Sequence, residues 1–432
     1  MRQMKDTGIE WIGKIPETWK TLAIKHLMQL YAGATPKSDN SELWDGDIPW
    51  ITPADYKTED VYVSGGRRNI SEKGLQSCAT TVLPINSIIF SKRAPIGLVA
   101  LNNTPLCTNQ GCIGCIVNQQ KANNKFYYYV LSVFTEQFEL FGSGTTFKEI
   151  SANNFANFKV ILPPISEQKL IADYLDTKCG EIDSLIALQE QMIEKLKAYK
   201  QSVITEAVTK GLDPNAKLVP SGIDWIGEIP EGWKVLKTKF IADKIFKGNG
   251  ITKEEVFPDG DTPCVRYGEI YSKYTQSFTN CISSTKLDIQ KSPQYFQHGD
   301  ILCAGTGELV EEIGKSIVYL GDQECLAGGD IIVIHHHQNP SFLNYALNSN
   351  YAQTQKSRGK AKLKVVHISA FEIGITYILL PPLSEQHSIA SYLDDKCSDI
   401  DHLIALKQQK IASLKDYKKS VIYEAVTGKT EI

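Results

Sequence analysis

Basic side chains recur at every second position between residues 356 and 364, and the chemistry that this pattern suits is phosphate binding. The run consists of Lys356, Arg358, Lys360, Lys362 and Lys364, with no acidic residue among them. In an extended chain all five lie on one face, whereas Ala361, Leu363 and Val365 lie on the other. A cationic ribbon with an apolar back suits the phosphate backbone of a nucleic acid. A solvated surface loop explains so short a run equally well.

Other basic residues could contact bases or phosphates, and two of them, Arg93 and Arg266, stand in turn-like contexts between apolar runs. An arginine can donate two parallel hydrogen bonds to O6 and N7 of guanine. Arg93 and Arg266 could equally be partners in structural ion pairs. The candidate contact residues outside the ribbon are Arg67, Arg68, Lys92, Arg93, Lys148 and Arg266.

Motifs for catalysis, nucleotide binding and metal binding are absent or incomplete. The segment GELVEEIGKS, residues 307–316, has Leu309 where a phosphate-binding loop requires glycine. Cys112 and Cys115 lack a second pair at zinc spacing, so we expect them in a buried strand. The three consecutive histidines at 335–337 alternate faces in a strand and cannot readily chelate one ion. The sequence therefore predicts neither catalytic residues nor metal ligands.

Composition fits a globular protein of several domains. The chain has 432 residues, of which 42% are hydrophobic and 22% are charged, and its net charge is −3. This length predicts two to four domains of roughly 100–200 residues each. A chain so close to neutral can bind nucleic acid only through local patches. No run approaches the ~20 apolar residues of a membrane span, and the N-terminus does not resemble a signal peptide. Because the ten cysteines form no disulfide framework, we expect a cytoplasmic protein with reduced thiols.

The chain contains an internal repeat. Residues 162–211 return as residues 380–429, with roughly two positions in three identical. A second pair, GIEWIGKIPETWK at 8–20 and GIDWIGEIPEGWK at 222–234, supports the duplication. The protein therefore consists of two half-molecules in tandem, which can present two like faces to one partner.

A periodic apolar stripe in each copy predicts a long helix that packs against its counterpart. Stripe positions are four and three residues apart in alternation, as in a coiled coil. Ser166 and Ser384 are expected to be the helix N-caps, and Gly211 and Gly428 follow the last periodic residues. The alternative is an amphipathic helix on the surface of its own domain. The predicted seam comprises Ile182, Ile186, Ile193, Leu196 and Val203 in the first copy, and Ile400, Ile404, Ile411, Leu414 and Val421 in the second.

The middle part of each half differs most between the halves. Two bodies, at about 21–160 and 235–378, follow the segments with paired tryptophans, which we expect to pack against these bodies. Apolar runs at 82–101 and 298–322 predict strand–loop–strand units. The clearest match between the bodies is GDIPWITPADY at 46–56 with GDTPCVRYGEI at 260–270. The repeated flanks thus indicate a common framework that carries two different recognition surfaces, joined by a turn-rich linker at 211–222.

Together these motifs resemble the specificity subunit of a bacterial type I restriction–modification system. The resemblance spans nearly the whole chain and rests on the doubled WIG…IPE.WK and LPP[IL]SEQ…IA.YLD segments, on FSKRAPIG with CTNQG, and on RYGEIY with GTGELVEEIGK. It implies an α+β fold with two mixed α/β target-recognition domains, separated by two long conserved helices that form an antiparallel coiled coil, in a pseudo-twofold repeat. The expected boundaries are recognition domains at 1–161 and 212–379 and helical spacers at 162–211 and 380–432.

The resemblance also implies function and partners. Each recognition domain would read one half of an asymmetric bipartite site in double-stranded DNA, with the helices setting the gap and docking two modification subunits. Those subunits would bind S-adenosylmethionine and methylate adenine, and restriction subunits would use ATP and magnesium. No cofactor is expected on this chain, which would be a cytoplasmic protein of a bacterium or archaeon.

Two other functions remain open from the residues alone. One is a self-contained nucleic-acid enzyme with an unrecognised active site. The other is a structural bridging protein without sequence preference. Duplicated recognition bodies on a rigid spacer favour a partner with two sites at fixed separation, which duplex DNA provides through its helical repeat.

Overall fold

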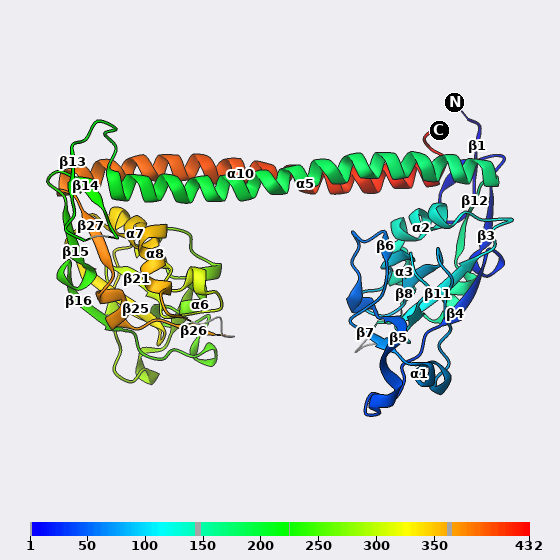
Figure 1. Ribbon diagram of the computed structural model, residues 1–432, viewed down its shortest axis with the longest axis horizontal. Helices are drawn as coiled ribbons and strands as arrows, with labels where there is room; N and C mark the ends of the chain where they lie inside the picture. Colours follow the sequence, from blue (N-terminus) through cyan, green and yellow to red (C-terminus); the bar gives the residue numbers. More distant parts are fainter. Residues whose placement is uncertain (1, 143–147, 224, 361–364) are drawn as a thin grey trace. The chain divides into compact units, whose positions relative to one another are not determined.

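The computed structural model describes residues 2–142, 148–223, 225–360 and 365–432. These fall into two compact units, one of Met1–Glu190 with Gln409–Ile432 and the other of Gln191–Gln408. Each unit contains one body and segments of two long helices, α5 (Ile165–Lys210) and α10 (Leu383–Val426) (Figure 1). Because the unit boundaries fall within both helices, each unit combines helical segments from both halves of the repeat.

The first unit is built on a five-stranded sheet with one three-stranded sheet beside it. The larger sheet has the order β4 (Met28–Ala32), β11 (Cys112–Val117), β8 (Ile88–Ser91), β9 (Val99–Asn102) and β6 (Tyr62–Val63). The smaller sheet has the order β10 (Cys107–Thr108), β5 (Trp44–Ile51) and β7 (Arg68–Ile70). The short helices are α1 (Glu72–Ser77), α2 (Asn124–Val133), α3 (Thr135–Leu140), α4 (Ala152–Asn157) and the 3₁₀ turns η1 (Ile24–His26), η2 (Ser41–Leu43) and η3 (Pro53–Asp55).

The second unit repeats this topology. Its five-stranded sheet has the order β16 (Ala242–Lys247), β25 (Ile331–His336), β21 (Ile301–Ala304), β23 (Ser316–Tyr319) and β18 (Ser277–Phe278). The second sheet is β19 (Ser283–Thr285), β17 (Thr262–Val265), β24 (Cys325–Ala327) and β20 (Tyr295–Phe296), and β22 (Thr306–Gly307) pairs with β26 (Val366–His367). The short helices are α6 (Tyr267–Ser272), α7 (Pro340–Asn348), α8 (Asn350–Ser357), α9 (Ala370–Gly374), η4 (Thr238–Phe240), η5 (Lys253–Glu255), η6 (Leu287–Ile289) and η7 (Val310–Glu312).

The strand–loop–strand predictions are confirmed by β8 with β9 and by β21 with β23. All four strands are buried along their whole length, because the apolar residues of both faces are covered. In the first unit Phe90 packs against Phe138 and Phe155 from α3 and α4. This aromatic layer makes one continuous core that extends to the N-terminal end of α5. Cys112 and Cys115 lie in β11 and are fully buried, as predicted.

The segment before each body ties that body to the start of a long helix. In the first unit β1 (Met4–Asp6) pairs with β2 (Lys14–Pro16), and β3 (Lys20–Ala23) pairs with β12 (Lys159–Leu162). In the second unit β13 (Leu218–Pro220) pairs with β14 (Glu228–Pro230), and β15 (Lys234–Lys237) pairs with β27 (Tyr377–Leu380). The linker predicted as turn-rich at 211–222 contains no helix, and it includes the short strand β13.

The paired tryptophans anchor these segments, as predicted. The indole of Trp19 donates to Glu167 over 3.1 Å, and that of Trp233 donates to Glu385 over 3.1 Å. Trp11 stacks on Phe158 at a centroid distance of 5.1 Å. The same indole–carboxylate hydrogen bond thus occurs once in each half, which shows that the repeat extends to individual contacts.

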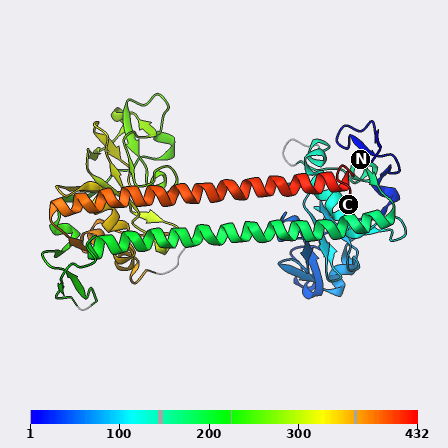
Figure 2. The same cartoon turned by 90° about the horizontal axis from the view of Figure 1, so that it is seen from above.

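The two long helices pair in antiparallel fashion, and each unit supplies its own contacts. In the first unit Ile182 and Ile186 pack with Leu414, and Lys418 bonds Asp183 at 2.7 Å. In the second unit Lys200 bonds Asp401 at 2.6 Å. Asp183 pairs with Lys418, and Lys200, further along α5, pairs with Asp401, which is earlier in α10. The two helices therefore run in opposite directions (Figure 2). All ten predicted seam residues are buried or half-buried, and Ile182, Ile186, Ile411 and Leu414 pack together between the helices. The predicted antiparallel helix pair is thus confirmed, and the contacts of the other six seam residues across it stay a prediction.

The N-terminal ends of the two long helices differ from the prediction. Ser166 and Ser384 are not N-caps, because α5 begins at Ile165 and α10 at Leu383. The backbone N–H of Gln168 already donates to the Pro164 carbonyl over 3.0 Å, so the first turn includes the proline. Gly211, with a φ of +76°, follows the last residue of α5 as predicted. Within the described part of the chain, no helix combines the length and apolar character needed to span a bilayer.

Candidate nucleic-acid interface

Three strands in each body end at a common place, which brings their following loops together. In the first body Asn109 N–H donates to Ile51 O over 2.9 Å, and Lys92 N–H donates to Gly111 O over 2.8 Å. These bonds join the loops after β5, β8 and β10, and we call this place the first junction. The loops after β17, β21 and β24 form the second junction, through Gly328 N–H to Val265 O at 2.8 Å and Gly305 N–H to Asp330 O at 2.7 Å. Four of the predicted contact residues lie at these junctions.

Lys92 and Arg93 share one carboxylate at the first junction. Lys92 Nζ lies 2.8 Å from Glu149 Oε1, and Arg93 Nε lies 2.7 Å from Oε2. Burial raises the pKa of Glu149, but the hydrogen bonds and charges of the two cations outweigh this effect and lower it. Two cations on one carboxylate leave a net positive charge. Because Arg93 remains 44% exposed and Lys92 only 14%, Arg93 is the better placed to meet an external anion.

Arg67 lies at the first junction beside a buried carboxylate. Its Nε is 3.6 Å from Asp55 Oδ1, and its Nη2 donates to the Ala54 carbonyl over 3.3 Å. Asp55 also accepts from the backbone N–H of Thr52, the N-cap of η3, over 2.8 Å. The arginine side chain is 79% exposed while the carboxylate is 6% exposed. The outer edge of the guanidinium is therefore free for a ligand.

Two further predicted contact residues of the first body lie outside this cluster. Arg68, on β7, stacks over Trp44 at 4.1 Å from the ring centroid and lies 3.5 Å from Asp45. Lys148 is exposed, immediately before the Arg93–Glu149 bridge. Contact of either residue with DNA stays a prediction.

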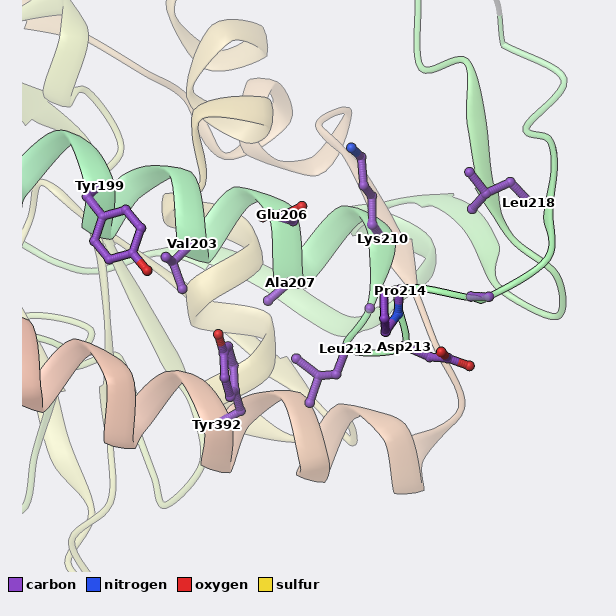
Figure 3. Close-up of a pocket in the computed structure, with 12 residues that line it drawn as sticks. Tyr199, Val203, Glu206, Ala207, Lys210, Leu212, Asp213, Pro214, Leu218 and Tyr392 are labelled. Carbon is purple, nitrogen blue, oxygen red and sulfur yellow. The ribbon is translucent and has the colours of Figure 1, made fainter.

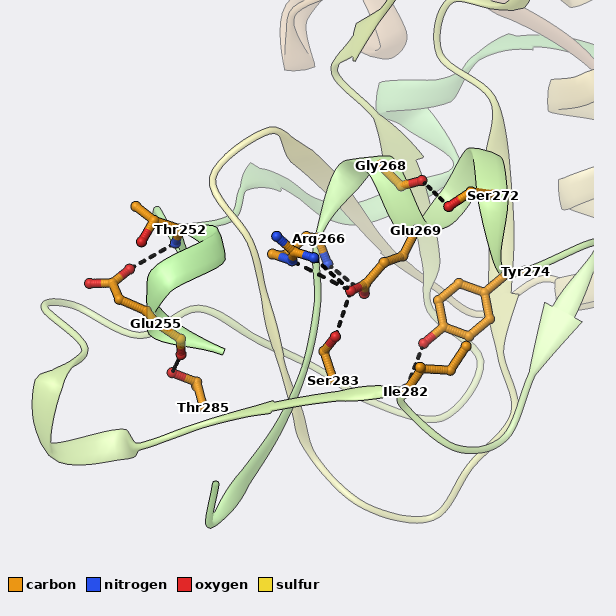
Figure 4. A network of polar contacts seen from close by, with 10 residues as sticks. All are labelled: Thr252, Glu255, Arg266, Gly268, Glu269, Ser272, Tyr274, Ile282, Ser283 and Thr285. Atoms are coloured by element: carbon orange, nitrogen blue, oxygen red, sulfur yellow. Dashed lines mark hydrogen bonds and ion pairs between the residues drawn. The ribbon is translucent and has the colours of Figure 1, made fainter. Parts of the chain in front are cut away.

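Arg266 lies at the second junction, as the N-cap of α6 (Figure 4). Its Nη2 donates to Glu269 Oε1 over 3.4 Å, and the hydroxyl of Ser283 donates to the same oxygen over 2.6 Å. Arg266, Tyr267 and Gly268 line a cavity of about 650 Å³ with the loop at 250–253. Arg266 thus forms an ion pair with Glu269, and the cavity leaves room for a ligand beside the pair, so its contact with DNA stays a prediction.

The cationic ribbon is wrong as a continuous extended strand. Lys356 lies in α8, is 3% exposed and donates from Nζ to the Gly314 carbonyl over 2.8 Å. Burial lowers the pKa of Lys356 to about 8. A lysine enclosed in this way cannot reach a phosphate. The spacing of basic residues at every second position was therefore misleading, because it places side chains on one face only in an extended chain and the run begins inside α8.

The remaining ribbon residues divide into three cases. Lys360 donates to Glu372 over 2.7 Å and to the His367 carbonyl over 2.6 Å, so its charge is already compensated. Arg358 is exposed after the end of α8. Lys362 and Lys364 lie outside the described residues. Phosphate contact by Arg358, Lys362 and Lys364 stays a prediction.

The consecutive histidines alternate faces, as predicted. His335 pairs with Asp300 at 2.6 Å and His337 with Asp243 at 3.2 Å. His336 is half-buried with its Nε2 enclosed, and burial lowers its pKa to about 4. Burial likewise raises the pKa of Cys112 to about 12. Across the ranges that the structure describes, no group of three or more His, Cys, Asp or Glu side chains is arranged to hold a metal ion.

Sequence reasoning missed the acidic partners at both junctions. Asp55, Glu149, Glu269 and the hydroxyl of Ser283 were not among the candidates. The alignment of GDIPWITPAD with GDTPCVRYGE places Asp55 opposite Glu269, and this shared acidic position was the available signal.

A groove with a mixed polar and apolar lining lies at the end of α5 in the second unit (Figure 3). It has a volume of about 730 Å³, and its walls include Tyr199, Leu212, Leu218 and Tyr392. These four side chains are between 37% and 58% exposed. The helices carry more exposed apolar residues away from the seam, namely Leu185, Leu188, Met192, Leu403, Leu406 and Tyr417.

Comparison with known proteins gives consistent matches over the whole chain. A family model described as type I restriction modification DNA specificity domain matches twice, at residues 16–198 and 230–416. The MjaIX specificity subunit of Methanocaldococcus jannaschii is 28% identical over 444 residues, which cover 100% of this chain and 97% of that protein. The EcoKI specificity subunit of Escherichia coli strain K12 is 22% identical, covering 96% and 90%.

Solved structures share the fold. A chain from a study of complex assembly and conformational transition in a type I restriction–modification system superposes with a TM-score of 0.71 at 16% identity, covering 95% of this chain and 98% of that one. The HsdS subunit of Thermoanaerobacter tengcongensis gives a TM-score of 0.51 at 16% identity, covering 96% and 98%.

Proposed function

We propose that this chain, which belongs to the type I restriction–modification DNA specificity family, assigns one half of a bipartite DNA site to each of its two bodies. The observation that carries this proposal is the pairing of one repeated topology with two different sets of side chains at the junctions. Two bodies that differ in this way suit an asymmetric site rather than a palindrome. Residues at the junctions would identify bases, and exposed cations around them would hold the phosphates.

The paired helices would serve as the spacer that fixes the unread gap between the half-sites. Support comes from the equivalent ion pairs Lys418–Asp183 and Lys200–Asp401, which fix the helix register in each unit separately. In the first unit, the packing of Ile182 and Ile186 with Leu414 adds apolar burial to this register. A spacer needs a defined register, since a slip of one turn would move an end by about 5.4 Å.

Methyltransferase subunits would dock on the exposed apolar side of the helices and in the groove at the end of α5. Several large apolar side chains exposed on one element are typical of a partner site. Tyr199 and Tyr417 occupy the same position in the two copies and are each 58% exposed. Two equivalent surfaces would accommodate two modification subunits, one for each half of the repeat.

The chemistry would lie in the partners. S-adenosylmethionine would bind to the modification subunits, and ATP with magnesium would bind to the restriction subunits. This chain would supply recognition and scaffolding only. The proposal agrees with the incomplete catalytic motifs of the sequence, in which Leu309 stands in the place of a phosphate-loop glycine.

One reconstitution tests the function. The chain is assembled with methyltransferase subunits, incubated with DNA and S-adenosylmethionine, and the methylated adenines are mapped. We expect methylation within a two-part motif with a constant gap, and none from the chain alone. Methylation or cleavage by the chain alone would favour the self-contained enzyme, whereas assembly without any motif would favour the bridging protein.

A pair of substitutions tests the docking surface. Tyr199→Ser with Tyr417→Ser should reduce binding of methyltransferase subunits while leaving thermal unfolding nearly unchanged, because both side chains are already exposed. Tyr62→Ser, at a residue 43% exposed on the first body, is the matched control. Unchanged assembly of the double variant would place the docking surface elsewhere.

A further inference from the structure

Two buried carboxylates occupy the same place in the two bodies. Asp55 is the third residue of η3 after β5, and Glu269 is the third residue of α6 after β17. Each accepts a hydrogen bond from the backbone N–H three residues earlier, at 2.8 Å from Thr52 and 3.0 Å from Arg266. The carboxylate side chains are only 6% and 8% exposed. A buried carboxylate requires compensating donors or cations.

In both bodies an arginine supplies this compensation, but it comes from a different part of the chain. Arg67 follows the loop that leads into β7, and its backbone N–H also donates to Asp55 Oδ1 over 3.2 Å. Arg266 belongs to the same strand–helix connection as Glu269, with its Nε and Nη2 both 3.4 Å from Oε1. The acid has kept its position between the bodies, and the arginine has not.

Each carboxylate holds only the inner side of its arginine. Asp55 contacts Nε of Arg67, and the side chain is otherwise 79% exposed. Glu269 contacts Nε and Nη2 of Arg266, whose side chain is 29% exposed and faces the 650 Å³ cavity. A guanidinium carries five N–H donors in a planar fork. The Ala54 carbonyl accepts from Nη2 of Arg67 over 3.3 Å, and the remaining donors of each guanidinium stay available in a fixed orientation.

We propose that Asp55 and Glu269 are positioning residues that hold Arg67 and Arg266 as the guanine-reading arginines of the two bodies. The ligand of each site is the O6 and N7 edge of a guanine in duplex DNA, which matches two parallel N–H donors of one guanidinium. An arginine that is already held in place loses less conformational entropy on binding than a free arginine does, so its binding costs less free energy. This inference rests on the proposed function and deepens it by naming the base and the residues.

The competing explanation is that each carboxylate only caps its short helix. A third carboxylate in the same region separates the two roles. Glu255 accepts from the backbone N–H of Thr252 over 2.8 Å in the same geometry (Figure 4). No arginine contacts Glu255 among the residues that the structure describes. Glu255→Gln therefore reproduces any capping effect without touching an arginine.

The test selects DNA from a pool of random duplexes with the full chain assembled with methyltransferase subunits, and sequences the bound fraction. The wild-type protein tests the proposed function alone, because that function requires the bound DNA to share a two-part motif. The variants then test the roles of the two carboxylates. Glu269→Gln and Asp55→Asn keep an oxygen that can accept the capping hydrogen bond, and lose the charge that holds the arginine. Glu255→Gln is the control. Thermal unfolding of each variant shows whether it folds.

We expect Glu269→Gln to lower the preference for one guanine in one half of the motif by at least about fivefold, with the other half unchanged. Asp55→Asn should do the same in the other half, and Glu255→Gln should change neither. An even loss across all positions, or an unchanged motif, would overturn the proposal. Where a carboxylate variant does not fold, Arg266→Lys and Arg67→Lys replace it, because lysine keeps the charge and loses the fork. An unchanged motif with these variants would also overturn it.

Discussion

The two bodies share a backbone and differ in the chemistry placed on it. At the first junction Ile150 N–H donates to Lys92 O over 3.0 Å, and at the second Ile368 N–H donates to Gly305 O over 2.9 Å. On this common bridge the first body carries Arg93 with Glu149. The second carries Thr306 with His367, whose Nδ1 lies 3.0 Å from the hydroxyl. An ion pair is thus replaced by a hydroxyl–imidazole contact without a change of backbone.

Contacts near the long helices show the opposite behaviour. Tyr129 donates to Asp176 over 2.9 Å in the first half, and Tyr345 donates to Asp394 over 2.8 Å in the second. A glutamine in the first turn of each long helix is duplicated as well. Gln168 accepts from the N–H of Asn123, the N-cap of α2, and Gln386 accepts from the N–H of Asn339, the N-cap of α7. Side chains that build the framework are duplicated, whereas those that face outward at the junctions are free to change. This comparison supports the proposal that the junctions carry the sequence specificity.

The largest expected effect compares the seam in the two units. Leu414→Asp should destabilise the protein by several kcal/mol, because it places an unpaired charge at a position that is 9% exposed. Leu196→Asp, at the equivalent half-buried position in the second unit, should cost less. Urea unfolding measures both. Leu185→Asp, at a residue 48% exposed, should be nearly neutral, and a cost equal to that of Leu414→Asp would mean that burial in the seam is not the cause.

A smaller effect concerns a half-buried histidine that only the second body has. His336 pairs with the first residue of β16, as Val117 pairs with the first residue of β4. Burial lowers the pKa of His336 from 6.5 to about 4, with Asp243 opposing and His337 adding to the shift. The unfolded chain therefore binds a proton between pH 6.5 and 4 that the folded chain does not. The contribution of His336 to the free energy of unfolding is complete above pH 6.5. It falls as the pH drops toward 4, by at most about 3 kcal/mol.

His336→Val, which copies the residue of the first body, should remove this part of the acid sensitivity. Unfolding free energies measured between pH 7 and 4.5 would show a shallower fall for the variant than for the wild type. His337→Val is the control, since that ring is 88% exposed. Equal slopes in the wild type and His336→Val would contradict the assignment.

The smallest effect distinguishes two neighbouring cations. Arg358→Ala should reduce the slope of log affinity against log salt by about 0.9, the value for one lost phosphate contact. Lys360→Ala should leave the slope unchanged, because Lys360 is already bonded to Glu372. Affinity for DNA measured at several salt concentrations gives both slopes. A reduced slope only for Lys360→Ala would reverse the roles.

Periodicity predicted the long-range framework well and the junctions poorly. The pairing of the long helices was predictable from residues such as Ile182, Ile186 and Leu414, because an apolar stripe sustained over several turns must be buried against another surface. The burial of Lys356 was not predictable, because a local helix capped by Ser349 turns the first residue of the charge run inward. The Arg67–Asp55 pair was equally hidden, since its members are separated by a whole loop and a strand pairing. Partner choice at the junctions depends on which loops meet, and sequence spacing does not encode that.

The unit boundaries have a consequence for the order in which this protein can be completed on the ribosome. Residues 191–408 contain everything that the second unit needs, whereas the first unit requires Gln409–Ile432 as well. The N-terminal body is therefore synthesised first and finished last. Until the final residues emerge, Ile182 and Ile186 lack Leu414, their apolar cover within that unit. A nascent chain that stalls near residue 408 would expose this surface, and chaperone binding should concentrate there.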